Sequence, residues 1–397
     1  MAITPVRKEW KSAMSGRERF NRQMHFQSID RSFNTEFGFW PENYSQWDLF
    51  VKNGITNHKE ANVFFGFDKL CFGIGSFFIY PPIEEKEIEV RDNTRIIING
   101  DGNLAEVPLA GGGSTIPHFL KPSVTTPDDW KRMKEEHFDV GYPGRFPDFG
   151  ILTGDKGDTR HPFSAHGVAI ETLRHYVPDD ERRDFPLGIS CGSMIGKIRD
   201  MLTFEGLAYA CYDYPDMVED MVETCCTLVE NLLDRVLPYF HFDYAAGWED
   251  ICFKNGPIVS IDFFKSVVVP RYKRIRKKLA EHGIDIWYTD CDGDVRPLLP
   301  YFLEGGINCL FPFEVNSSGH PGALLDEYQG ELRIMGGVDK LRLGEGKEAI
   351  RSCLESLEKY VLRGGFIPFV DHMCPPNVKS DDYLYYLDLK EKMFGMS

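Results

Sequence analysis

The chain has 397 residues, 42% of them hydrophobic, which is enough for the core of one large α/β domain. Its net charge of -16 and its lack of a Lys- or Arg-rich run argue against a nucleic-acid partner and against binding to an anionic membrane surface. No apolar leader follows Met1, no run approaches the length of a membrane span, and the ten cysteines form no CxxC pair. We therefore expect a cytoplasmic protein with reduced thiols.

The first third of the chain is irregular. A capped, charged pattern predicts an opening helix over residues 5–24, and residues 33–40 are aromatic and strand-like. Residues 86–108 alternate in polarity between Asn- and Gly-rich turns, which predicts an antiparallel β-meander inserted outside the main domain. Residues 111–114 lack the Lys-Ser/Thr pair of a phosphate-binding loop and favour a hinge. Residues 139–162 form a long Gly-, Pro- and Asp-rich loop.

From residue 186 onward, strand and helix patterns alternate at least six times, which favours parallel strands. A (β/α)8 TIM barrel fits better than an open doubly wound sheet, because no Gly-rich nucleotide turn follows the first of these strands. We predict one barrel domain over residues 1–397, with an N-terminal extension and the meander at 86–108. The predicted strands cover residues 186–191, 242–247, 284–288, 308–314, 332–339 and 366–372.

Acidic residues recur at the predicted carboxyl ends of five successive strands. In a barrel these ends meet on one face, where active sites are built. Each acid alone also fits a solvated turn or the cap of the following helix. Several carboxylates in a mouth of low dielectric are costly without a cation, however, so the series favours a site for a divalent ion such as zinc. The strand ends are Glu249-Asp250, Asp290-Cys291-Asp292, Glu314, Asp339-Lys340 and Asp371-His372.

From about Pro186 to the C-terminus, the chain resembles the uroporphyrinogen decarboxylase superfamily. Its barrel is shared by decarboxylases and by corrinoid-dependent methyltransferases, so the resemblance implies the same fold here. The matching segments are Trp248-Glu249-Asp250 followed by residues 255–260, Asp290-Cys291-Asp292-Gly293 followed by residues 297–300, residues 336–339, and residues 371–378.

The methyltransferase branch is the better match. Decarboxylases resemble one another in an Arg-Gln-Ala-Gly-Arg segment that holds the substrate carboxylates, whereas this chain has Arg22-Gln23-Met24-His25 and acidic strand ends. The methyltransferase branch is similar to zinc enzymes that have a His-x-Cys-Gly segment after one strand and a further zinc ligand near the last strand. Asp290-Cys291-Asp292-Gly293 occupies the first place, and His372 stands near the second.

The resemblance implies that zinc or another divalent metal acts as a Lewis acid on a small methylated substrate, and that a corrinoid protein accepts the methyl group. Carboxylates in place of a thiolate favour a hard donor such as an aryl or alkyl methyl ether, which would make the protein an O-demethylase. A metal-free decarboxylase with Asp and His proton donors and a binding module without turnover are the alternatives, and a homodimer is left open. We expect metal binding by Asp290, Asp292 and His372, catalysis by Glu249, Glu314, Asp371 and His372, and substrate binding by Asp250, Asn255 and Asp339.

Overall fold

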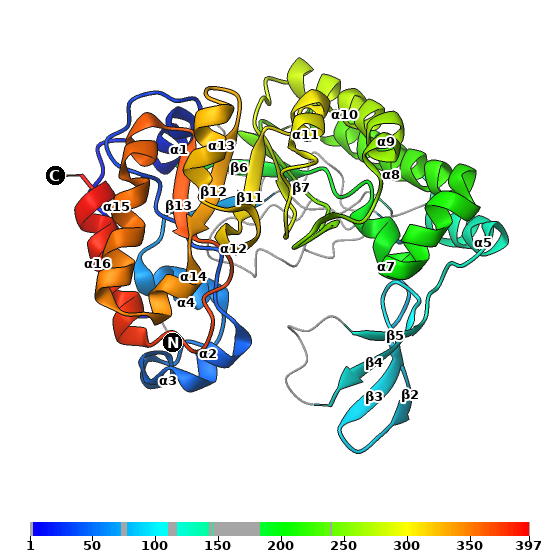
Figure 1. Ribbon diagram of the computed structural model, residues 1–397, viewed down its shortest axis with the longest axis horizontal. Coiled ribbons are helices and arrows are strands. Elements are labelled where there is room, and N and C mark those ends of the chain that lie inside the picture. Colours follow the sequence, from blue (N-terminus) through cyan, green and yellow to red (C-terminus); the bar gives the residue numbers. More distant parts are fainter. Residues whose placement is uncertain are drawn as a thin grey trace.

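A parallel β-sheet lies at the centre of the molecule (Figure 1). The structure is a computed structural model, and it describes residues 3–72, 78–109, 117–142, 145, 183–238 and 240–396. The sheet has seven strands in the order β1-β6-β7-β10-β11-β12-β13. This order never reverses, as it would in a doubly wound sheet. The strands are β1 (Cys71–Phe72), β6 (Leu187–Ser190), β7 (Tyr244–Trp248), β10 (Trp287–Asp290), β11 (Cys309–Phe313), β12 (Arg333–Val338) and β13 (Phe366–Val370).

The side chains of these strands alternate between two apolar clusters. In β10, Trp287 packs against Tyr272 of a covering helix, with ring centroids 5.6 Å apart. The next residue, Tyr288, points the other way and packs against Phe311 of the neighbouring strand at 4.7 Å. Parallel sheets are usually buried on both faces, which makes their strands nearly continuous hydrophobic runs. This is why the strands after residue 186 can be recognised in the sequence.

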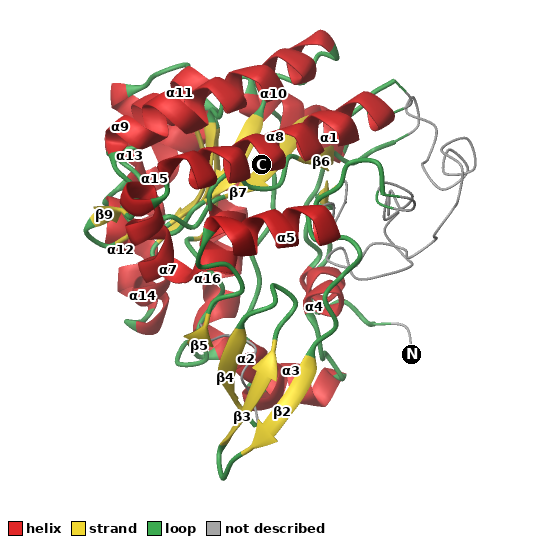
Figure 2. Cartoon of the chain, turned by 90° about the vertical axis from the view of Figure 1, so that its right-hand side faces the viewer, coloured by secondary structure: helices red, strands yellow, loops and turns green. Residues whose placement is uncertain are grey.

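Helices cover the outside of the sheet (Figure 2). Their buried residues recur at helical spacing, as in α8, which buries Met217, Met221 and Leu228 on one side. Within the part of the chain that the structure describes, no helix is both long and apolar enough to cross a membrane. The helices that follow β6 are α7 (Gly196–Asp213), α8 (Pro215–Val236), α9 (Ile261–Phe263), the π-helical turn η2 (Phe264–Val268), α10 (Val269–Glu281), α11 (Leu299–Gly305), α12 (Val315–Ser318), α13 (Pro321–Glu327), α14 (Lys340–Gly344), α15 (Lys347–Arg363) and α16 (Ser380–Phe394).

An extended segment at residues 33–39 lies between the first and last strands of the sheet. The Asn34 carbonyl accepts a hydrogen bond of 2.7 Å from the amide of Asp68, just before β1. The Gly38 carbonyl accepts one of 2.9 Å from the amide of Cys374, just after β13. The strand predicted here therefore forms only an isolated bridge to Cys374, but it contacts chain that flanks both edges of the sheet.

Helix α1 (Gly16–Met24) lies at the amino ends of the strands, away from the acidic strand ends. The buried Gln23 amide donates a hydrogen bond of 2.7 Å to the carbonyl of Phe366, the first residue of β13. Arg333, the first residue of β12, donates one of 2.9 Å to the carbonyl of Met24. Arg22 and Gln23 are therefore at the opposite end of the sheet from the acids.

The helix predicted over residues 5–24 is wrong in its first half. Ser15 caps the observed helix, since its hydroxyl accepts a hydrogen bond of 3.1 Å from the amide of Glu18. The preceding segment is not helical, because the Val6 amide donates to the carbonyl of Phe64 at 2.9 Å. Contacts with a distant segment thus decided a stretch that local propensity favoured as helix.

An ion pair beside α1 predicts a pH effect on stability. The His25 ring lies 2.8 Å from an Asp285 carboxylate oxygen, and this hydrogen bond raises the pKa of His25 and lowers that of Asp285. The contribution is fully present below the unfolded histidine pKa of about 6.5 and is lost as pH rises through the raised folded pKa. We expect Asp285→Asn to lower the thermal midpoint at pH 6 more than at pH 9. An equal loss at both pH values, measured by circular dichroism, would contradict this.

The predicted meander is present as an antiparallel sheet that projects from the body (Figure 1). It gains a fourth strand that the sequence pattern did not show. Asn103 fixes the base of the sheet to α7, since its side-chain amide donates to the Asp200 carbonyl at 2.5 Å. The loop at 111–114 and most of 139–162 lie outside the described residues. The remaining elements are β2 (Lys86–Val90), β3 (Thr94–Ile98), β4 (Leu104–Pro108), β5 (His118–Lys121), α2 (Pro41–Gln46), α3 (Asp48–Asn53), α4 (His58–Phe65) and α5 (Pro127–His137).

Candidate functional site

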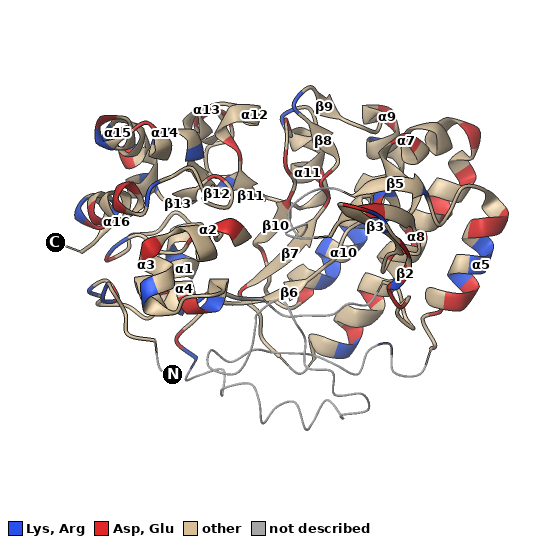
Figure 3. Cartoon of the chain, turned by 90° about the horizontal axis from the view of Figure 1, so that it is seen from below, with Lys and Arg blue, Asp and Glu red and all other residues tan. Residues whose placement is uncertain are grey.

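Five neighbouring strands carry ionisable residues at their carboxyl ends, as the sequence predicted. In the register of the sheet, Asp290 of β10 pairs with Trp248 of β7 and with Phe311 of β11, so these strands end close to one another. Figure 3 views the molecule from below and colours the acidic residues around these strands red. The residues are Glu249 and Asp250 after β7, Asp290 and Asp292 at the end of β10, Glu314 after β11, Asp339 and Lys340 after β12, and Asp371 and His372 after β13.

Three aspartates converge at this face and are called the aspartate trio below: Asp250, Asp290 and Asp292. One carboxylate oxygen from each lies within 4.8 Å of the other two. Burial, and then the charge of Asp292, raise the pKa of Asp250 to about 6. Desolvation, and then the charges of Asp250 and Asp292, raise the pKa of Asp290 well above its ordinary value. Three mutually repelling carboxylates are an arrangement that a bound cation stabilises.

The Asp292 side chain joins the trio to His372. Its Oδ2 atom lies 3.5 Å from the His372 Nε2 atom. Its Oδ1 atom is buried and has no hydrogen-bond partner among the residues that the structure describes. An orphaned carboxylate oxygen beside two further carboxylates fits a hard divalent cation, which prefers oxygen ligands.

The three residues of the trio are not the same three that the sequence predicted as metal ligands. Asp290 and Asp292 are in it, as predicted. Asp250, which the sequence assigned to substrate binding, joins them. His372, predicted as a ligand, lies beside Asp292, and its ring packs 5.2 Å from that of Phe37.

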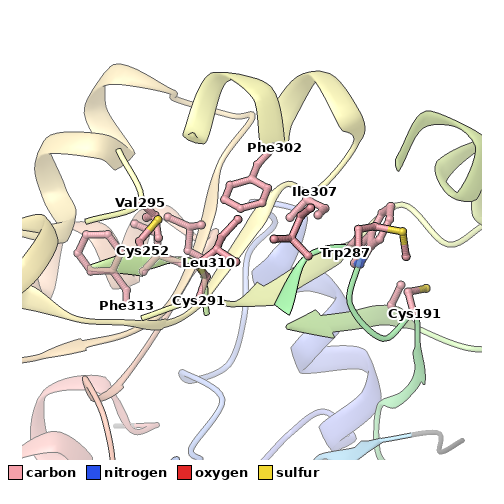
Figure 4. Packing of buried hydrophobic residues seen from close by; sticks show 14 of the residues in the cluster. Cys191, Cys252, Trp287, Cys291, Val295, Phe302, Ile307, Leu310 and Phe313 are labelled. Atoms are coloured by element: carbon pink, nitrogen blue, oxygen red, sulfur yellow. The ribbon is translucent and has the colours of Figure 1, made fainter. Parts of the chain in front are cut away.

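Cys291 lies between Asp290, the last residue of β10, and Asp292, but its side chain faces the other way. It is 5% exposed and packs with Cys252 and Val295 (Figure 4). A hydrogen bond with Cys252, together with burial, raises the pKa of the Cys291 thiol well above its ordinary value. Alternation along an extended chain thus directs Asp290 and Asp292 to one side and the thiol to the other.

A short hairpin covers the turn after the trio. It consists of β8 (Cys252–Phe253) and β9 (Gly256–Pro257). Gly293 has a φ of 88°, and a Cβ atom there would lie 2.5 Å from the Cys252 carbonyl oxygen, so the close approach requires glycine. Asn255, predicted to bind substrate, is exposed in the turn of this hairpin.

Glu314 forms an ion pair with a residue that the sequence reasoning did not select. The Lys340 Nζ atom lies 2.6 Å from Glu314 Oε1, and the Gly293 amide donates to Oε2 at 3.4 Å. Burial alone would lower the pKa of Lys340, but the charge of Asp371 and the bond to Glu314 outweigh it, and the pKa is raised. Lys340 is therefore a permanent cation near the trio. Its position directly after Asp339 at a strand end is the sequence feature that could have indicated a place in the site.

Glu249, predicted as catalytic, binds the start of a helix in this structure. It is 1% exposed, and its carboxylate accepts five hydrogen bonds, four from the amino end of α7 and one from Tyr272 of α10. Negative charge at a helix N-terminus is favourable, because the free amides there need acceptors. The donors are Ser193 Oγ (3.0 Å), Met194 N (2.8 Å), Ile195 N (2.8 Å), Gly196 N (2.9 Å) and Tyr272 Oη (2.5 Å).

Two further predicted site residues also bind backbone amides. Asp371 is buried and accepts from the amides of Lys340 at 3.0 Å and Val315 at 2.9 Å, so it joins the loops after β11 and β12. Burial raises its pKa to about 6. Asp339 caps α14 through the amide of Leu341 at 2.9 Å. The structure therefore brings Asp250, Asp290, Asp292 and His372 together, with Glu314 and Lys340 beside them, and places Glu249, Asp339 and Asp371 on backbone amides.

Comparison with known proteins supports the fold through solved structures and not through sequence. No protein-family model matches the chain, and no curated protein matches it by sequence. Among solved structures, the chain is similar to a methyltransferase from Methanosarcina mazei, with a TM-score of 0.51 and 11% sequence identity. The two proteins share a fold. The similarity covers 96% of this chain and 98% of that chain. The methyltransferase-like fold agrees with part of the resemblance found in the sequence and does not bear on uroporphyrinogen decarboxylases as a family.

Proposed function

We propose that the protein is a corrinoid-dependent methyltransferase with a divalent metal site at the aspartate trio. The observation that carries the proposal is the Oδ1 atom of Asp292, on the carboxyl-end face of a methyltransferase-like fold. It is buried, has no hydrogen-bond partner within the described part of the chain, and belongs to a side chain that converges with Asp250 and Asp290. We further propose that the sheet closes into a (β/α)8 barrel over residues 1–397, with residues 33–39 as its eighth element. The hydrogen bonds of that segment toward β1 and β13 support closure.

The proposed ligands are Asp250, Asp290 and Asp292. Three carboxylates suit magnesium or manganese, and zinc also accepts carboxylate oxygens. When bound, the ion supplies a Lewis acid that polarises the atom carrying the methyl group. His372 lies 3.5 Å from Asp292, so it is placed to orient that ligand and to donate a proton from Nε2 to the departing group.

The substrate proposed is a small methylated molecule with a hard donor atom, such as a methyl ether. Phe37 borders this site, with its ring 5.2 Å from His372 and 5.2 Å from Phe311. These rings offer an apolar wall that excludes water from one side of the substrate. A partner protein that carries a corrinoid is the proposed methyl acceptor. The Lys340–Glu314 ion pair leaves Glu314 neutralised, so the trio retains most of the uncompensated negative charge.

A metal-free decarboxylase is the second candidate. The pKa of about 6 for Asp250 and the raised pKa of Asp290 favour it, because these groups hold protons that a decarboxylation can use. The position of Arg22 and Gln23 in α1, at the amino ends of the strands, argues against a porphyrinogen substrate held as in decarboxylases.

An isotope assay separates the two candidates. The purified protein is supplied with a reduced corrinoid and a panel of methyl ethers that carry labelled methyl groups, with added metal or with chelator. We expect transfer of label to the corrinoid that chelator abolishes. Release of carbon dioxide from a panel of small carboxylic acids, unaffected by chelator and without methyl transfer, would instead establish the decarboxylase.

A further inference from the structure

We propose that Arg199 is a positioning residue that holds Asp250 in the conformation by which its carboxylate joins the aspartate trio. The proposal rests on the proposed metal site and adds a residue that neither the sequence pattern nor the comparisons assign. It concerns a side chain on α7, a helix that contributes no member of the trio.

The backbone of Asp250 has an unfavourable conformation. Its φ is 47°, in the left-handed region that side chains other than glycine rarely adopt. In this conformation the side chains of two consecutive residues, Glu249 and Asp250, point to different parts of the structure. The Glu249 carboxylate binds the start of α7, whereas the Asp250 Oδ1 atom accepts a hydrogen bond of 3.1 Å from the amide of Asp292. A contact that stabilises the left-handed residue therefore also fixes the carboxylate within the trio.

Arg199 provides that contact. Its Nη1 atom donates a hydrogen bond to the carbonyl oxygen of Asp250. Because the bond is made to the backbone of Asp250, the carboxylate of that residue stays available to a ligand. Arg199 thus acts on the metal site mainly through the conformation of Asp250. Among the described residues it donates no hydrogen bond to a trio carboxylate, although its charge opposes the rise in the pKa of Asp250.

The guanidinium of Arg199 is itself held in place. It is 14% exposed and lies over the rings of Phe204 at 5.0 Å and Trp248 at 5.7 Å. Its Nη2 atom lies 2.8 Å from the Asp200 carboxylate. Stacking on two rings and a fixed carboxylate partner leave the planar side chain little freedom, so it can impose a geometry on the Asp250 carbonyl.

Cobalt(II) binding tests the proposal, since the visible spectrum of this ion reports the geometry of its ligands. We compare the wild-type protein with Arg199→Gln by titration with cobalt(II) chloride. We expect Arg199→Gln to bind cobalt about tenfold more weakly or worse, with a changed spectrum. Loss of the bond to the Asp250 carbonyl leaves the left-handed backbone uncompensated, and this outweighs the gain from removing a positive charge near the Asp250 carboxylate. Lys197→Met is the matched control. It removes an ion pair between α7 and Asp101 and contacts no member of the trio, so its affinity should stay within about twofold of wild type.

The outcomes separate this proposal from the function it rests on. If the wild-type protein binds no cobalt, the metal site itself fails. If it binds cobalt and Arg199→Gln binds it equally well with the same spectrum, the role of Arg199 alone is overturned. If the Arg199→Gln protein does not fold, Arg199→Lys is measured in its place, since it keeps the charge but not the planar guanidinium. Wild-type cobalt affinity in Arg199→Lys would likewise overturn the proposal. In an Asp250→Ala background, Arg199→Gln should have little further effect on affinity, and an undiminished effect would show that Arg199 acts by another route.

Discussion

Asp292→Asn is expected to lower the affinity of the protein for divalent metal by about 100-fold or more while leaving it folded. The substitution keeps the shape of the side chain but removes its charge and one of its two oxygens. Among the described residues, the buried Oδ1 atom of Asp292 has no hydrogen-bond partner, and the side chain belongs to the trio. Substitutions one shell away from a metal typically cost about 10–100-fold in affinity, so loss of a direct ligand should cost at least as much. Isothermal titration with manganese(II) and zinc(II) measures the effect.

Asp294→Asn is the matched control for this experiment. Asp294 lies two residues further along the same turn and pairs with the exposed Arg296, outside the trio. Its substitution should leave metal affinity nearly unchanged. The metal-free Asp292→Asn protein should be at least as stable as the wild type, because one of three repelling carboxylates is gone. Equal losses of affinity in both variants, or unchanged binding in Asp292→Asn, would contradict the assignment.

Glu249→Ala should destabilise the protein by more than about 3 kcal/mol, because it leaves several buried donors at the start of α7 without an acceptor at about 1–3 kcal/mol each. Urea denaturation followed by circular dichroism measures the loss. Glu219→Ala removes a half-exposed carboxylate that pairs with Arg271, and it should cost about 1 kcal/mol or less. A stable Glu249→Ala protein that lost methyl transfer would instead support the catalytic role first expected from the sequence.

The strands after residue 186 could be predicted from the sequence, whereas the place of the segment at 33–39 and the start of the opening helix could not. Strands such as Phe366–Val370 are buried on both faces, so a continuous run of apolar residues identifies them in the sequence. The segment at 33–39 is extended but lacks a regular ladder, and only its bonds to distant chain locate it at both edges of the sheet. The residues before Gly16 were decided in the same way, by a contact between Val6 and Phe64.

The face of the site could be predicted, but its membership could not. Parallel strands end on one side, so the acids had to gather there. Whether an acid binds backbone amides or joins the trio depends on the backbone conformation of single residues. Glu249 and Asp250 are neighbours in the sequence, and only the left-handed conformation of Asp250 sends one to the helix amides and the other to the trio. Lys340 pairs with Glu314, and the acidic pattern of the strand ends does not indicate a cation at this place.

Anomalous X-ray scattering from crystals grown with manganese or zinc tests the central claim most directly. The proposed site predicts one strong peak at the carboxyl ends of β7 and β10, about 2.0–2.2 Å from an oxygen of each of Asp250, Asp290 and Asp292. His372 should contact Asp292 beside the ion. A peak on other residues, or no peak at the trio in crystals saturated with metal, would contradict the account.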